Sequence, residues 1–498
     1  MRAASMTAPM TFSFLGESRH IGGWEVDAPR LWAYNLHYFD DLNAQDAAAR
    51  RAWHVEAIQS WIVANPPLTA PGWEPYPTSL RIVNWIKWAM GGAPLDPRAI
   101  ESLALQVRAL EGRLEYHLLG NHLLANAKAL TFAGLFFEGK EADAWLARGA
   151  DILQREMDEQ ILPDGGHFER SPMYHSIVLE DVADLMNIAS AFADAIPSTR
   201  RPLAALRPDT LQRMRAWLLA MCHPDGEISF FNDAAIGIAP SPGEVERYAR
   251  QIAGVASPAL PTSRGPVHVV RLPDSGYIRA EAPEAVLLID VAPLGPDYLL
   301  GHAHADTLSF ELSLWGERLI VNGGTSVYEP GPVRSAERGT AAHTTVEIDG
   351  EDSSEVWAAF RVARRAHPVS LTVDATDDRL EVACSHDGYR WLRGKPVHRR
   401  AWSLSPGRLW VEDRVEGAYR SAVARFHLHP QVQISVDAGG EGGMLRLAGG
   451  REARWRLASG TARIDECTYS PEFGTRMPAK CLSVDFSASG KSCLEVSW

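Results

Sequence analysis

The hydrophobic pattern of the chain changes its period near residue 258, and this change constrains the fold more than any other feature. Before it, apolar residues recur at three- and four-residue steps, as in residues 118–133, 178–192 and 211–221. Such spacing is typical of amphipathic helices. After it, apolar and polar residues alternate, as in residues 307–314, which is typical of strands in an antiparallel sheet. The sequence therefore predicts a helical half followed by an antiparallel β half.

The break between the halves coincides with residues 253–265, a segment rich in proline, serine and glycine that is the best candidate for a linker. A chain of 498 residues has room for two or three domains. We expect two, a helical domain over residues 1–257 and an antiparallel β domain over residues 258–498. Successive helical hairpins in the first half would suit a toroid or a solenoid.

Charge and composition narrow the class of protein. Lys and Arg number 49 against 62 Asp and Glu, a net charge of −13, which disfavours nucleic acid as a partner. No apolar run reaches the roughly 18 residues of a transmembrane helix, so no membrane partner is expected. The apolar patch at residues 12–15 is too short for a signal peptide. We therefore expect a cytoplasmic protein, or a periplasmic or secreted one if the start codon is misassigned.

The five cysteines lack CxxC spacing and are expected to be reduced thiols. The oligomeric state stays open.

Two motifs of the helical half contain groups able to carry chemistry. In GNHLLANAKAL, Asn121 and His122 follow a glycine, and Asn126 lies one helical turn later. The alternative interpretation is a set of polar residues that pack helices together.

In PDGGHFERSPMYH, the polar residues are dense for a connector, and the helix is expected to resume near Ile177. Loops on a rigid scaffold often build sites, although an exposed polar loop would have the same pattern. The polar residues of this second motif are His167, Glu169, Arg170, Tyr174 and His175.

Two motifs of the β half add imidazoles and guanidiniums. In GHAHADTLSFEL, a strand would place His302, His304 and Asp306 on one face, an arrangement that suits metal binding or acid–base chemistry. In the segment that begins Val-Asn-Gly-Gly-Thr, the residues Arg334, Arg338 and His343 could reach the same end of the sheet. A polar hairpin with a solvated face is the alternative there.

These four motifs, in this order and at these spacings, resemble those of the heparinase II/III-like polysaccharide lyases. The resemblance spans most of the chain. It implies an incomplete (α/α) toroid joined to an antiparallel β-sandwich, with the substrate cleft between them. It also implies β-elimination on an acidic polysaccharide or oligosaccharide that contains uronic acid, which leaves a C4–C5 unsaturated sugar. Heparan-type glycans, alginate and bacterial exopolysaccharides all carry uronates.

The resemblance assigns a role to each catalytic candidate. Asn121 would hydrogen-bond the uronate carboxylate, assisted by His122 or an arginine, because negative charge grows there in the transition state. Tyr174 would act as base, as acid toward the departing O4, or as both. His302 would be the second acid–base residue, since an imidazole titrates near neutral pH.

Further residues are candidates for substrate binding or for metal binding. Seven of the sixteen tryptophans lie in the first ninety residues, and indole faces either stack on sugars or fill cores. No cofactor is expected to be required. Some relatives hold a structural divalent metal such as zinc at the β-domain histidines, and His304 and His343 match two of its ligands. Asn322 stands where metal-binding relatives tend to have Asp, and an amide is a poor substitute on zinc. The candidate substrate-binding residues are Trp73, Tyr76, Arg81, His167, Glu169 and Arg338.

Three other functions fit parts of the sequence. A glycoside hydrolase on a helical toroid would use paired carboxylates, and Glu74, Glu169, Asp181 and Asp233 are the candidates. The HAHAD run suits a metallohydrolase, but Thr307 stands where an HxHxDH enzyme carries His. A non-catalytic factor that binds or assembles exopolysaccharide is the third alternative, because a fold does not guarantee a function.

Overall fold

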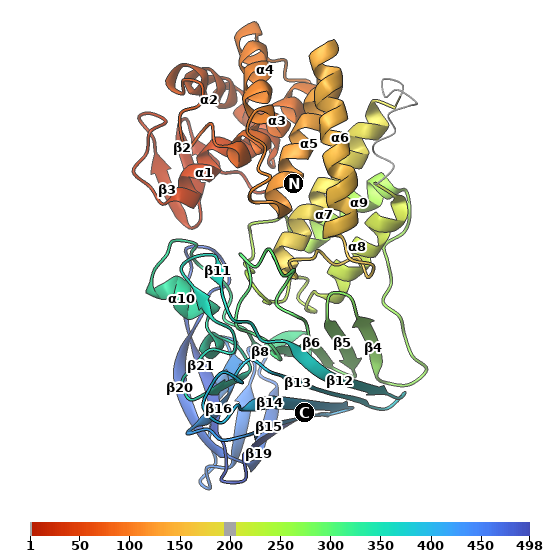
Figure 1. Ribbon diagram of the computed structural model, residues 1–498, viewed down its shortest axis with the longest axis vertical. Coiled ribbons are helices and arrows are strands. Elements are labelled where there is room, and N and C mark those ends of the chain that lie inside the picture. Colours follow the sequence, from red (N-terminus) through yellow and green to blue (C-terminus); the bar gives the residue numbers. More distant parts are fainter. Residues whose placement is uncertain (1, 194–205) are drawn as a thin grey trace. The chain divides into compact units, whose positions relative to one another are not determined.

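The computed structural model describes residues 2–193 and 206–498 (Figure 1). The chain forms two compact units, and each is discontinuous in sequence. The last passage of the chain from one unit to the other, after Ala256, lies in the predicted linker. Two earlier segments of the helical half belong with the sheets, so the domain limits at residues 257 and 258 stay a prediction. Unit 1 comprises Met1–Ile161, Ile177–Gln212 and Glu244–Ala256, and unit 2 comprises Leu162–Ser176, Arg213–Gly243 and Ser257–Trp498.

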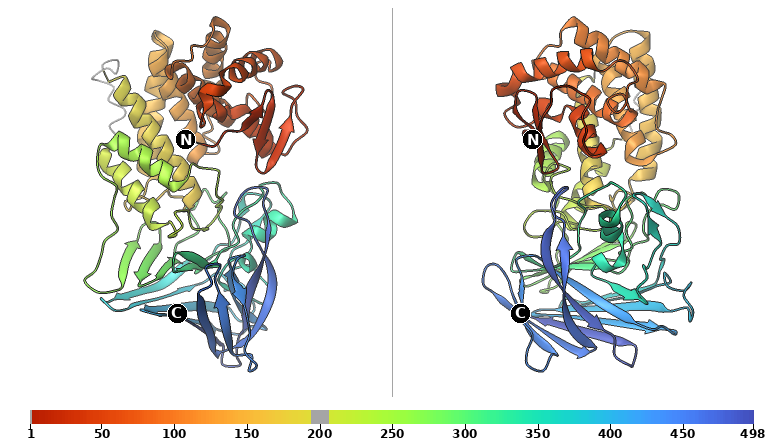
Figure 2. Two further views of the ribbon diagram at one scale, coloured as in Figure 1. Left: turned by 180° about the vertical axis from the view of Figure 1, so that it is seen from behind. Right: turned by 90° about the vertical axis from the view of Figure 1, so that its left-hand side faces the viewer.

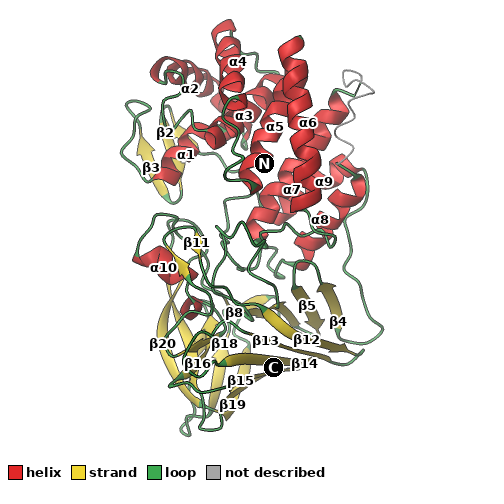
Figure 3. Ribbon diagram, in the orientation of Figure 1, coloured by secondary structure: helices red, strands yellow, loops and turns green. Residues whose placement is uncertain are grey.

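Helices make up most of unit 1, as the three- and four-residue periodicity predicts (red in Figure 3). Helix α5 is buried along almost its whole length and packs against α3 and α6 (Figure 1 and Figure 2). Proline at the first position begins α3 and α4, where its missing N–H costs nothing. The helices are α1 (Arg30–Tyr38), α2 (Arg51–Ala64), α3 (Pro75–Met90), α4 (Pro97–Glu111), α5 (Gly120–Phe136), α6 (Lys140–Gln160), α7 (Pro172–Ala191), α8 (Pro208–Ala220) and α9 (Pro242–Ala253), with 3₁₀ turns η1 (Asp40–Asn43) and η2 (Ala47–Arg50).

A small antiparallel sheet, which the sequence did not predict, precedes these helices in unit 1. Its strands are β1 (Met6–Ala8), β2 (Thr11–Phe14) and β3 (Glu17–His20). The buried carboxylate of Asp41 fastens this sheet, because Oδ1 accepts the backbone N–H groups of Ser5 and Met6 at 2.6 and 2.9 Å. Burial would raise the pKa of Asp41, but its hydrogen bonds with His54 and Arg50 lower that pKa to about 2.

Unit 2 contains two large sheets, in which every paired strand is antiparallel (yellow in Figure 3). The C-terminal region is therefore an antiparallel β region, as predicted. The nine-stranded sheet has the order β20-β21-β16-β8-β7-β6-β5-β4, with β9 paired to β16. Its strands are β4 (His268–Leu272), β5 (Tyr277–Ala282), β6 (Ala285–Asp290), β7 (Phe310–Leu314), β8 (Glu317–Val321), β9 (Val346–Ile348), β16 (Ala422–Leu428), β20 (Thr461–Tyr469) and β21 (Met477–Asp485).

The eight-stranded sheet has the order β12-β13-β14-β15-β22-β19-β18-β17. A short helix follows β8 in sequence, and a separate two-stranded hairpin precedes β12. The strands are β12 (Pro368–Ala375), β13 (Leu380–His386), β14 (Val397–Ser405), β15 (Arg408–Glu416), β17 (Gln433–Ile434), β18 (Gly442–Arg446), β19 (Glu452–Ser459) and β22 (Lys491–Ser497). The hairpin is β10 (Val356–Trp357) and β11 (Arg361–Val362), and the short helices are α10 (Pro332–Arg338) and η5 (Thr340–Ala342).

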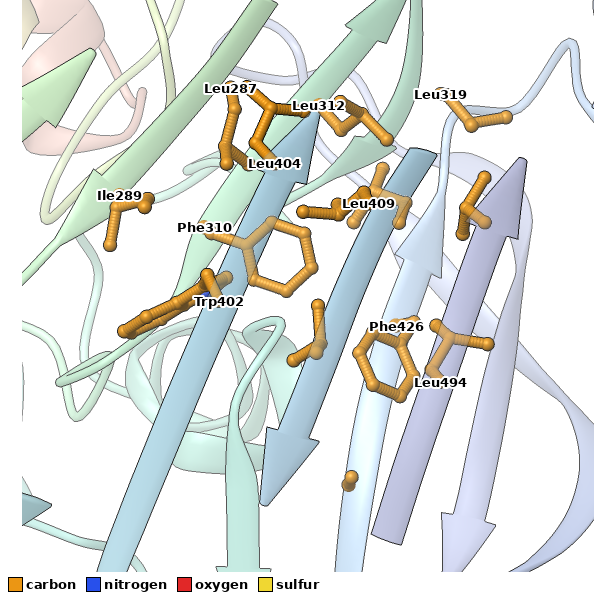
Figure 4. Close-up of a cluster of buried hydrophobic side chains, with 14 of the residues drawn as sticks. Leu287, Ile289, Phe310, Leu312, Leu319, Trp402, Leu404, Leu409, Phe426 and Leu494 are labelled. Atoms are coloured by element: carbon orange, nitrogen blue, oxygen red, sulfur yellow. The ribbon is translucent and has the colours of Figure 1, made fainter. Parts of the chain in front are cut away.

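Both sheets contribute side chains to one hydrophobic core (Figure 4). Burial alternates along β14 and β15, so every second side chain faces this core. Phe310 of the nine-stranded sheet packs edge-on against Trp402 of the eight-stranded sheet, with ring centroids 6.4 Å apart. Phe426 contacts the same phenyl ring at 6.2 Å. The two sheets are thus held together by apolar burial.

The predicted strand over His302, His304 and Asp306 is wrong. Strand β7 begins only at Phe310, and residues 301–309 form an irregular segment. Leu308 has a φ of 63°, which interrupts an extended backbone. The apolar alternation that predicted a strand belongs to β7, which starts after the histidines.

All five cysteines are free thiols, as expected from their spacing. Within residues 2–193 and 206–498, no helix combines the length and the apolar character that a membrane span requires.

Truncation of Phe310 tests the shared core. Phe310→Ala leaves a cavity between the sheets and should lower the free energy of unfolding by about 3–5 kcal/mol in chemical denaturation. Val369→Ala on β12 is the control, since Val369 is 42% exposed, and should change that free energy by about 0.5 kcal/mol or less. Equal effects of the two substitutions would contradict a core built from both sheets.

Candidate active site

The buried carboxylate of Asp233 is the centre of a polar cluster in unit 2. Both of its oxygens are used: Oδ1 accepts hydrogen bonds from Arg334 and from Nε2 of His304, and Oδ2 accepts them from Arg334 Nη2 at 2.7 Å and His302 Nδ1 at 2.9 Å. Burial would raise the pKa of Asp233, but the Arg334 guanidinium and the two histidines hold that pKa well below its ordinary value. Asp233 is therefore a charged anchor at neutral pH.

The bond to Asp233 determines the orientation and the tautomer of His302. A charged carboxylate only accepts hydrogen bonds, so Nδ1 of His302 carries the proton and Nε2 of the neutral ring has a free lone pair. Nε2 lies 3.8 Å from Oε2 of Glu169, and the His302 side chain is 13% exposed. An imidazole held in this way can accept a proton at Nε2.

His304 has a structural role in the Asp233 cluster. Its Nε2 bonds Asp233 at 2.8 Å and its Nδ1 lies 3.2 Å from Nε2 of His343, so both nitrogens are used. Burial is the main cause that lowers the pKa of His304 to about 4. A neutral, fully buried imidazole of this kind stabilises the Asp233 cluster and has no face for a substrate.

Tyr174 lies directly against His302. The two ring centroids are 3.9 Å apart, and the phenol oxygen of Tyr174 is 3.0 Å from that of Tyr328. Burial raises the pKa of Tyr328 well above its ordinary value, so Tyr328 stays a neutral phenol that can share its proton with Tyr174. The structure thus brings together the predicted pair Tyr174 and His302 and adds Tyr328.

Local packing places Tyr174. The helix resumes at Pro172, earlier than the predicted Ile177, so Tyr174 lies in the first turn of α7. Ser171 precedes that turn, and its hydroxyl accepts the N–H of Tyr174 at 3.2 Å. The same hydroxyl donates to the backbone carbonyl of Asp233. Tyr174 is therefore positioned by the residue whose side chain orients His302.

The glycines of the PDGG turn are required by close packing. Gly165 has a φ of 94°, and a Cβ there would lie 2.4 Å from the backbone of Arg213. A Cβ on Gly166 would lie 2.5 Å from the indole nitrogen of Trp217. The turn therefore packs closely against α8, and this contact fixes the start of the His167–His175 segment.

The other polar residues of this segment divide into two groups. His167 and His175 are fully buried, and burial lowers both pKa values, that of His175 to about 3. The Nδ1 of His175 accepts the backbone N–H of His167 at 3.2 Å, which is a packing role for His175. Glu169 is the member that faces His302.

The guanidiniums of Arg170, Arg334 and Arg338 form their bonds inside unit 2. Arg334 pairs with Asp233. Arg170 donates to the carbonyl of Ser275 at 3.0 Å. Arg338 is fully buried, with Nε and Nη2 bonded to the carbonyl of Ala303 at 3.1 and 2.9 Å. As placed here, Arg338 holds the backbone next to His302.

Asn121 and His122 belong to unit 1, where they begin α5. The ring of His122 stacks on Tyr76 with centroids 4.5 Å apart, and its Nδ1 lies 3.1 Å from Glu115. The His122 side chain is 31% exposed, and Asn121 is 7% exposed. Asn126 bonds Ser79 and Glu115, which confirms the helix-packing interpretation for that residue.

Trp73 and Arg81 lie in the core of unit 1. Trp73 is 2% exposed and donates its indole N–H to the carbonyl of Asn65. Arg81 is fully buried, lies 4.0 Å from the centre of the Trp61 ring and bonds Gln106 at 2.8 Å. In these positions both side chains stabilise the helical core, and Tyr76 is the candidate of this group that adjoins His122.

The side chains considered as metal ligands form hydrogen bonds with other groups of the protein. The amide of Asn322 accepts the N–H of Thr344 at 2.9 Å and donates to Ser309 at 3.3 Å. Both nitrogens of His304 are used as well. In the described residues, no group of three or more His, Cys, Asp or Glu side chains is arranged to hold an ion. In this arrangement these groups bond one another and the backbone, and we derive no chemical step through a metal.

Sequence reasoning missed the partners of the predicted residues. Tyr328 lies in the segment between Thr325 and Arg334, but no local pattern marks it as a partner of Tyr174. Asp233 was weighed as a hydrolase carboxylate, whereas the structure makes it the anchor of His302. The segment Ser-Phe-Phe-Asn-Asp, with two polar residues after an apolar run, is the one local signal for it.

Two known protein families match successive parts of the chain. The heparinase II/III N-terminus family matches residues 102–248, and the heparinase II/III-like C-terminal family matches residues 264–498. The two matches follow one another and take in most of the chain. The chain therefore belongs to the heparinase II/III-like family, which confirms the resemblance seen in its motifs.

Individual relatives vary in how much of the chain they cover. A heparin-sulfate lyase of Bacteroides stercoris is 35% identical over 122 residues, which are 24% of this chain and 18% of that protein. FtsZ-localized protein C of Caulobacter vibrioides is 26% identical over 447 residues, 84% of this chain and 73% of that protein. The crystal structure of heparinase III has a TM-score of 0.76 at 19% identity over 97% of this chain and 79% of that chain. The last comparison shows a shared fold.

The Asp233 anchor can be tested by substitution. Asp233→Asn leaves Arg334 buried without a counter-charge and should lower the free energy of unfolding at neutral pH by about 3–5 kcal/mol. The control is Asp437→Asn, whose ion pair with Arg454 is exposed and is worth about 1 kcal/mol or less.

The pH dependence of that difference follows from the sign of the shift. The pKa of Asp233 is lower in the folded chain than its ordinary 3.8, so the carboxylate stabilises the fold fully above pH 3.8 and loses this effect as the pH falls further. Denaturation of both proteins from pH 7 to pH 2 should show the difference shrinking below pH 3.8. A constant difference across this range would contradict a charged Asp233.

Proposed function

We propose that this protein is a polysaccharide lyase that cleaves a uronic-acid-containing polysaccharide by β-elimination. One observation carries the proposal: Asp233 bonds Nδ1 of His302, which orients this ring directly beside the hydrogen-bonded pair Tyr174 and Tyr328. An oriented base next to a phenol that can donate a proton is the set of groups that an elimination needs. The membership in the heparinase II/III-like family supports the same reaction class.

The proposed chemistry uses the two groups in sequence. Nε2 of His302 takes the C5 proton of the uronate, and the electron pair of that bond forms the C4–C5 double bond. The C4–O4 bond breaks toward oxygen, and Tyr174 gives its proton to O4. Tyr328 then supplies a hydrogen bond to the Tyr174 oxygen that carries the resulting negative charge. Atoms and charges balance, and no oxidant or metal takes part.

Neutralisation of the uronate carboxylate is assigned to Asn121 and His122. The negative charge of the developing enolate lies on this carboxylate, and amide or imidazole donors lower its energy. The partial exposure of His122 and its stacking on Tyr76 support a role for this group at the surface of unit 1. With this assignment we also infer the finer architecture of the family, an incomplete (α/α) toroid and a β-sandwich.

The carboxylates support a hydrolase less well. Glu74 pairs with Arg30, Asp181 pairs with Lys128, and Asp233 is fully buried with both oxygens occupied. A glycosidase needs one carboxyl group as acid and a second as base or nucleophile. Of the four candidates, Asp233 and Glu169 lie beside His302, and the oxygens of Asp233 are already used by Arg334 and the two histidines.

A non-catalytic binding or assembly role is the second candidate. The Caulobacter vibrioides relative aligns with far more of this chain than the Bacteroides stercoris lyase does, and its name states a localization with FtsZ and no reaction. The arrangement of Tyr174, His302 and Asp233 favours the enzyme. Turnover decides between the two functions.

The test is a screen of purified protein for unsaturated product. Heparan sulfate, chondroitin sulfate, alginate and bacterial exopolysaccharides should be incubated with the chain while the ultraviolet absorbance of the C4–C5 double bond is followed. We expect absorbance to rise with at least one uronate polysaccharide. New reducing ends without absorbance would identify a hydrolase, and binding without either would favour the non-catalytic role.

Tyr174→Phe is the matched variant in this screen. It removes the proton donor and keeps the ring against His302, so the rate should fall by about 100-fold or more while substrate binding is retained. Tyr116→Phe, at a tyrosine that is 44% exposed in unit 1, is the control and should keep the wild-type rate. A Tyr174→Phe variant with full activity would disprove the assignment of Tyr174.

The reaction is proposed to need no cofactor, and a structural zinc at His304 and His343 stays a prediction. Because the acid and the base are side chains, treatment with a chelator followed by dialysis should leave the rate unchanged. Elemental analysis of the same sample measures the metal content. Loss of activity that added zinc restores would show that a metal takes part.

A further inference from the structure

A short hairpin in unit 2 carries exposed side chains whose chemistry the catalytic groups do not use. Strands β10 and β11 pair with Val356 opposite Val362 and Trp357 opposite Arg361, and residues 358–360 join them. Trp357 is 54% exposed and Phe360 is 43% exposed. The hairpin follows α10 in sequence (Figure 1).

Two buried arginines of α10 hold the connecting residues of the hairpin. Nε of Arg334 donates to the carbonyl of Ala359 at 3.0 Å. Nη1 of Arg338 lies 3.4 Å from the carbonyls of Trp357 and Ala358. Arg334 is also the partner of Asp233, so the hairpin and the orientation of His302 depend on the same guanidinium.

Phe360 connects the hairpin to the candidate catalytic residues. Its ring centroid lies 5.2 Å from that of Tyr328 and 5.8 Å from that of His302. The Arg334 guanidinium carbon lies 5.5 Å from the centre of the same ring. The hairpin is therefore fixed beside the position where the sugar to be cleaved would lie.

Trp357 and Arg361 form a recognition face on this hairpin. Residues directly opposite one another in an antiparallel pair project from the same face, so the indole and the guanidinium leave the hairpin on one side. Among the described residues, Arg361 makes no ion pair. An exposed, unpaired guanidinium beside an exposed indole matches a sugar ring that carries an anionic group.

The charge of the chain makes this face distinctive. The net charge is −13, which opposes the approach of a polyanion. The guanidiniums of Arg170, Arg334 and Arg338 are bonded inside unit 2. Arg361 therefore offers an exposed positive charge on the hairpin whose Phe360 contacts His302, which those three arginines do not.

We propose that Trp357 and Arg361 bind an acidic sugar unit of the polysaccharide adjacent to the unit that is cleaved. The indole stacks on the pyranose ring, and the guanidinium pairs with a carboxylate or a sulfate group of that unit. This inference rests on the proposed function for its substrate class. It adds a subsite that selects anionic chains.

Binding without turnover tests the subsite. Full-length Tyr174→Phe protein should be titrated with heparan sulfate oligosaccharides, which carry carboxylates and sulfates, and with alginate oligosaccharides, which carry carboxylates alone. Adding Trp357→Ala or Arg361→Gln should weaken binding by about tenfold each, and the effect of Arg361→Gln should diminish as salt is raised. A loss for both ligands indicates a carboxylate at Arg361, and a loss for heparan sulfate alone indicates a sulfate.

Conservative and distant substitutions complete the design. Trp357→Phe and Arg361→Lys keep the ring and the charge, so they should restore most of the affinity. Arg408→Gln on β15 removes another exposed arginine of unit 2, 53% exposed at its side chain, and should leave affinity within about twofold. Melting temperatures should match across the set, because the substituted side chains are exposed.

The outcomes separate this subsite from the proposed reaction. If the wild type forms unsaturated product but Trp357→Ala and Arg361→Gln bind both oligosaccharides normally, the subsite is disproved and the lyase stands. If no product forms while both substitutions weaken binding, the subsite stands and the lyase fails. Failure of the Tyr174→Phe protein to bind either oligosaccharide overturns the subsite.

Discussion

A single buried carboxylate organises the candidate active site. Asp233 pairs with Arg334, fixes the tautomer of His302 and accepts a hydrogen bond from His304. Its own side chain is fully buried. An isolated charge in that position would be strongly unfavourable, and the guanidinium with its matched geometry makes the arrangement stable. The backbone carbonyl of Asp233 also accepts a hydrogen bond from the hydroxyl of Ser171. Ser171 directly precedes the helix that carries Tyr174 and bonds the N–H of Tyr174. The relative placement of Tyr174 and His302 therefore follows from one residue.

The same arrangement uses the buried arginines inside unit 2, so they would contribute little to binding the acidic substrate that we propose. Arg334 and Arg338 use their guanidiniums for Asp233 and for backbone carbonyls, which gives rigidity to α10, to the segment around Ala303 and to the β10–β11 hairpin. A charge that is already paired and fully buried contributes little field at the surface. Under the proposed function, recognition of an anionic chain would depend on exposed groups such as Arg361, which lies on the hairpin whose Phe360 contacts His302.

Several features of this protein were predictable from residue patterns. The period of the apolar residues predicted the helices of unit 1 and the antiparallel strands of unit 2, because burial on one face imposes that period. Tyr174 and His302 were singled out by the density of titratable groups around them, and the structure brings them into contact. The expected strand at His302 was wrong because Leu308 takes a left-handed conformation, which an apolar alternation does not reveal. Trp73 and Arg81 were expected to touch substrate, and the structure places both in the core, where the indole and the guanidinium find partners.

The sequence by itself determined the two structural classes, their order and the residue types available for acid–base chemistry. These properties depend on local periodicity and on side-chain chemistry, which a chain carries in any conformation. Only the tertiary structure decided which groups meet. Asp233, His302, Tyr328 and Arg334 are separated by up to 101 residues, and their contacts depend on how loops before β7 and around α10 fold back on one another. Tyr328 and the hairpin of Trp357 and Arg361 have no local signature, because their roles come from neighbours that are distant in sequence.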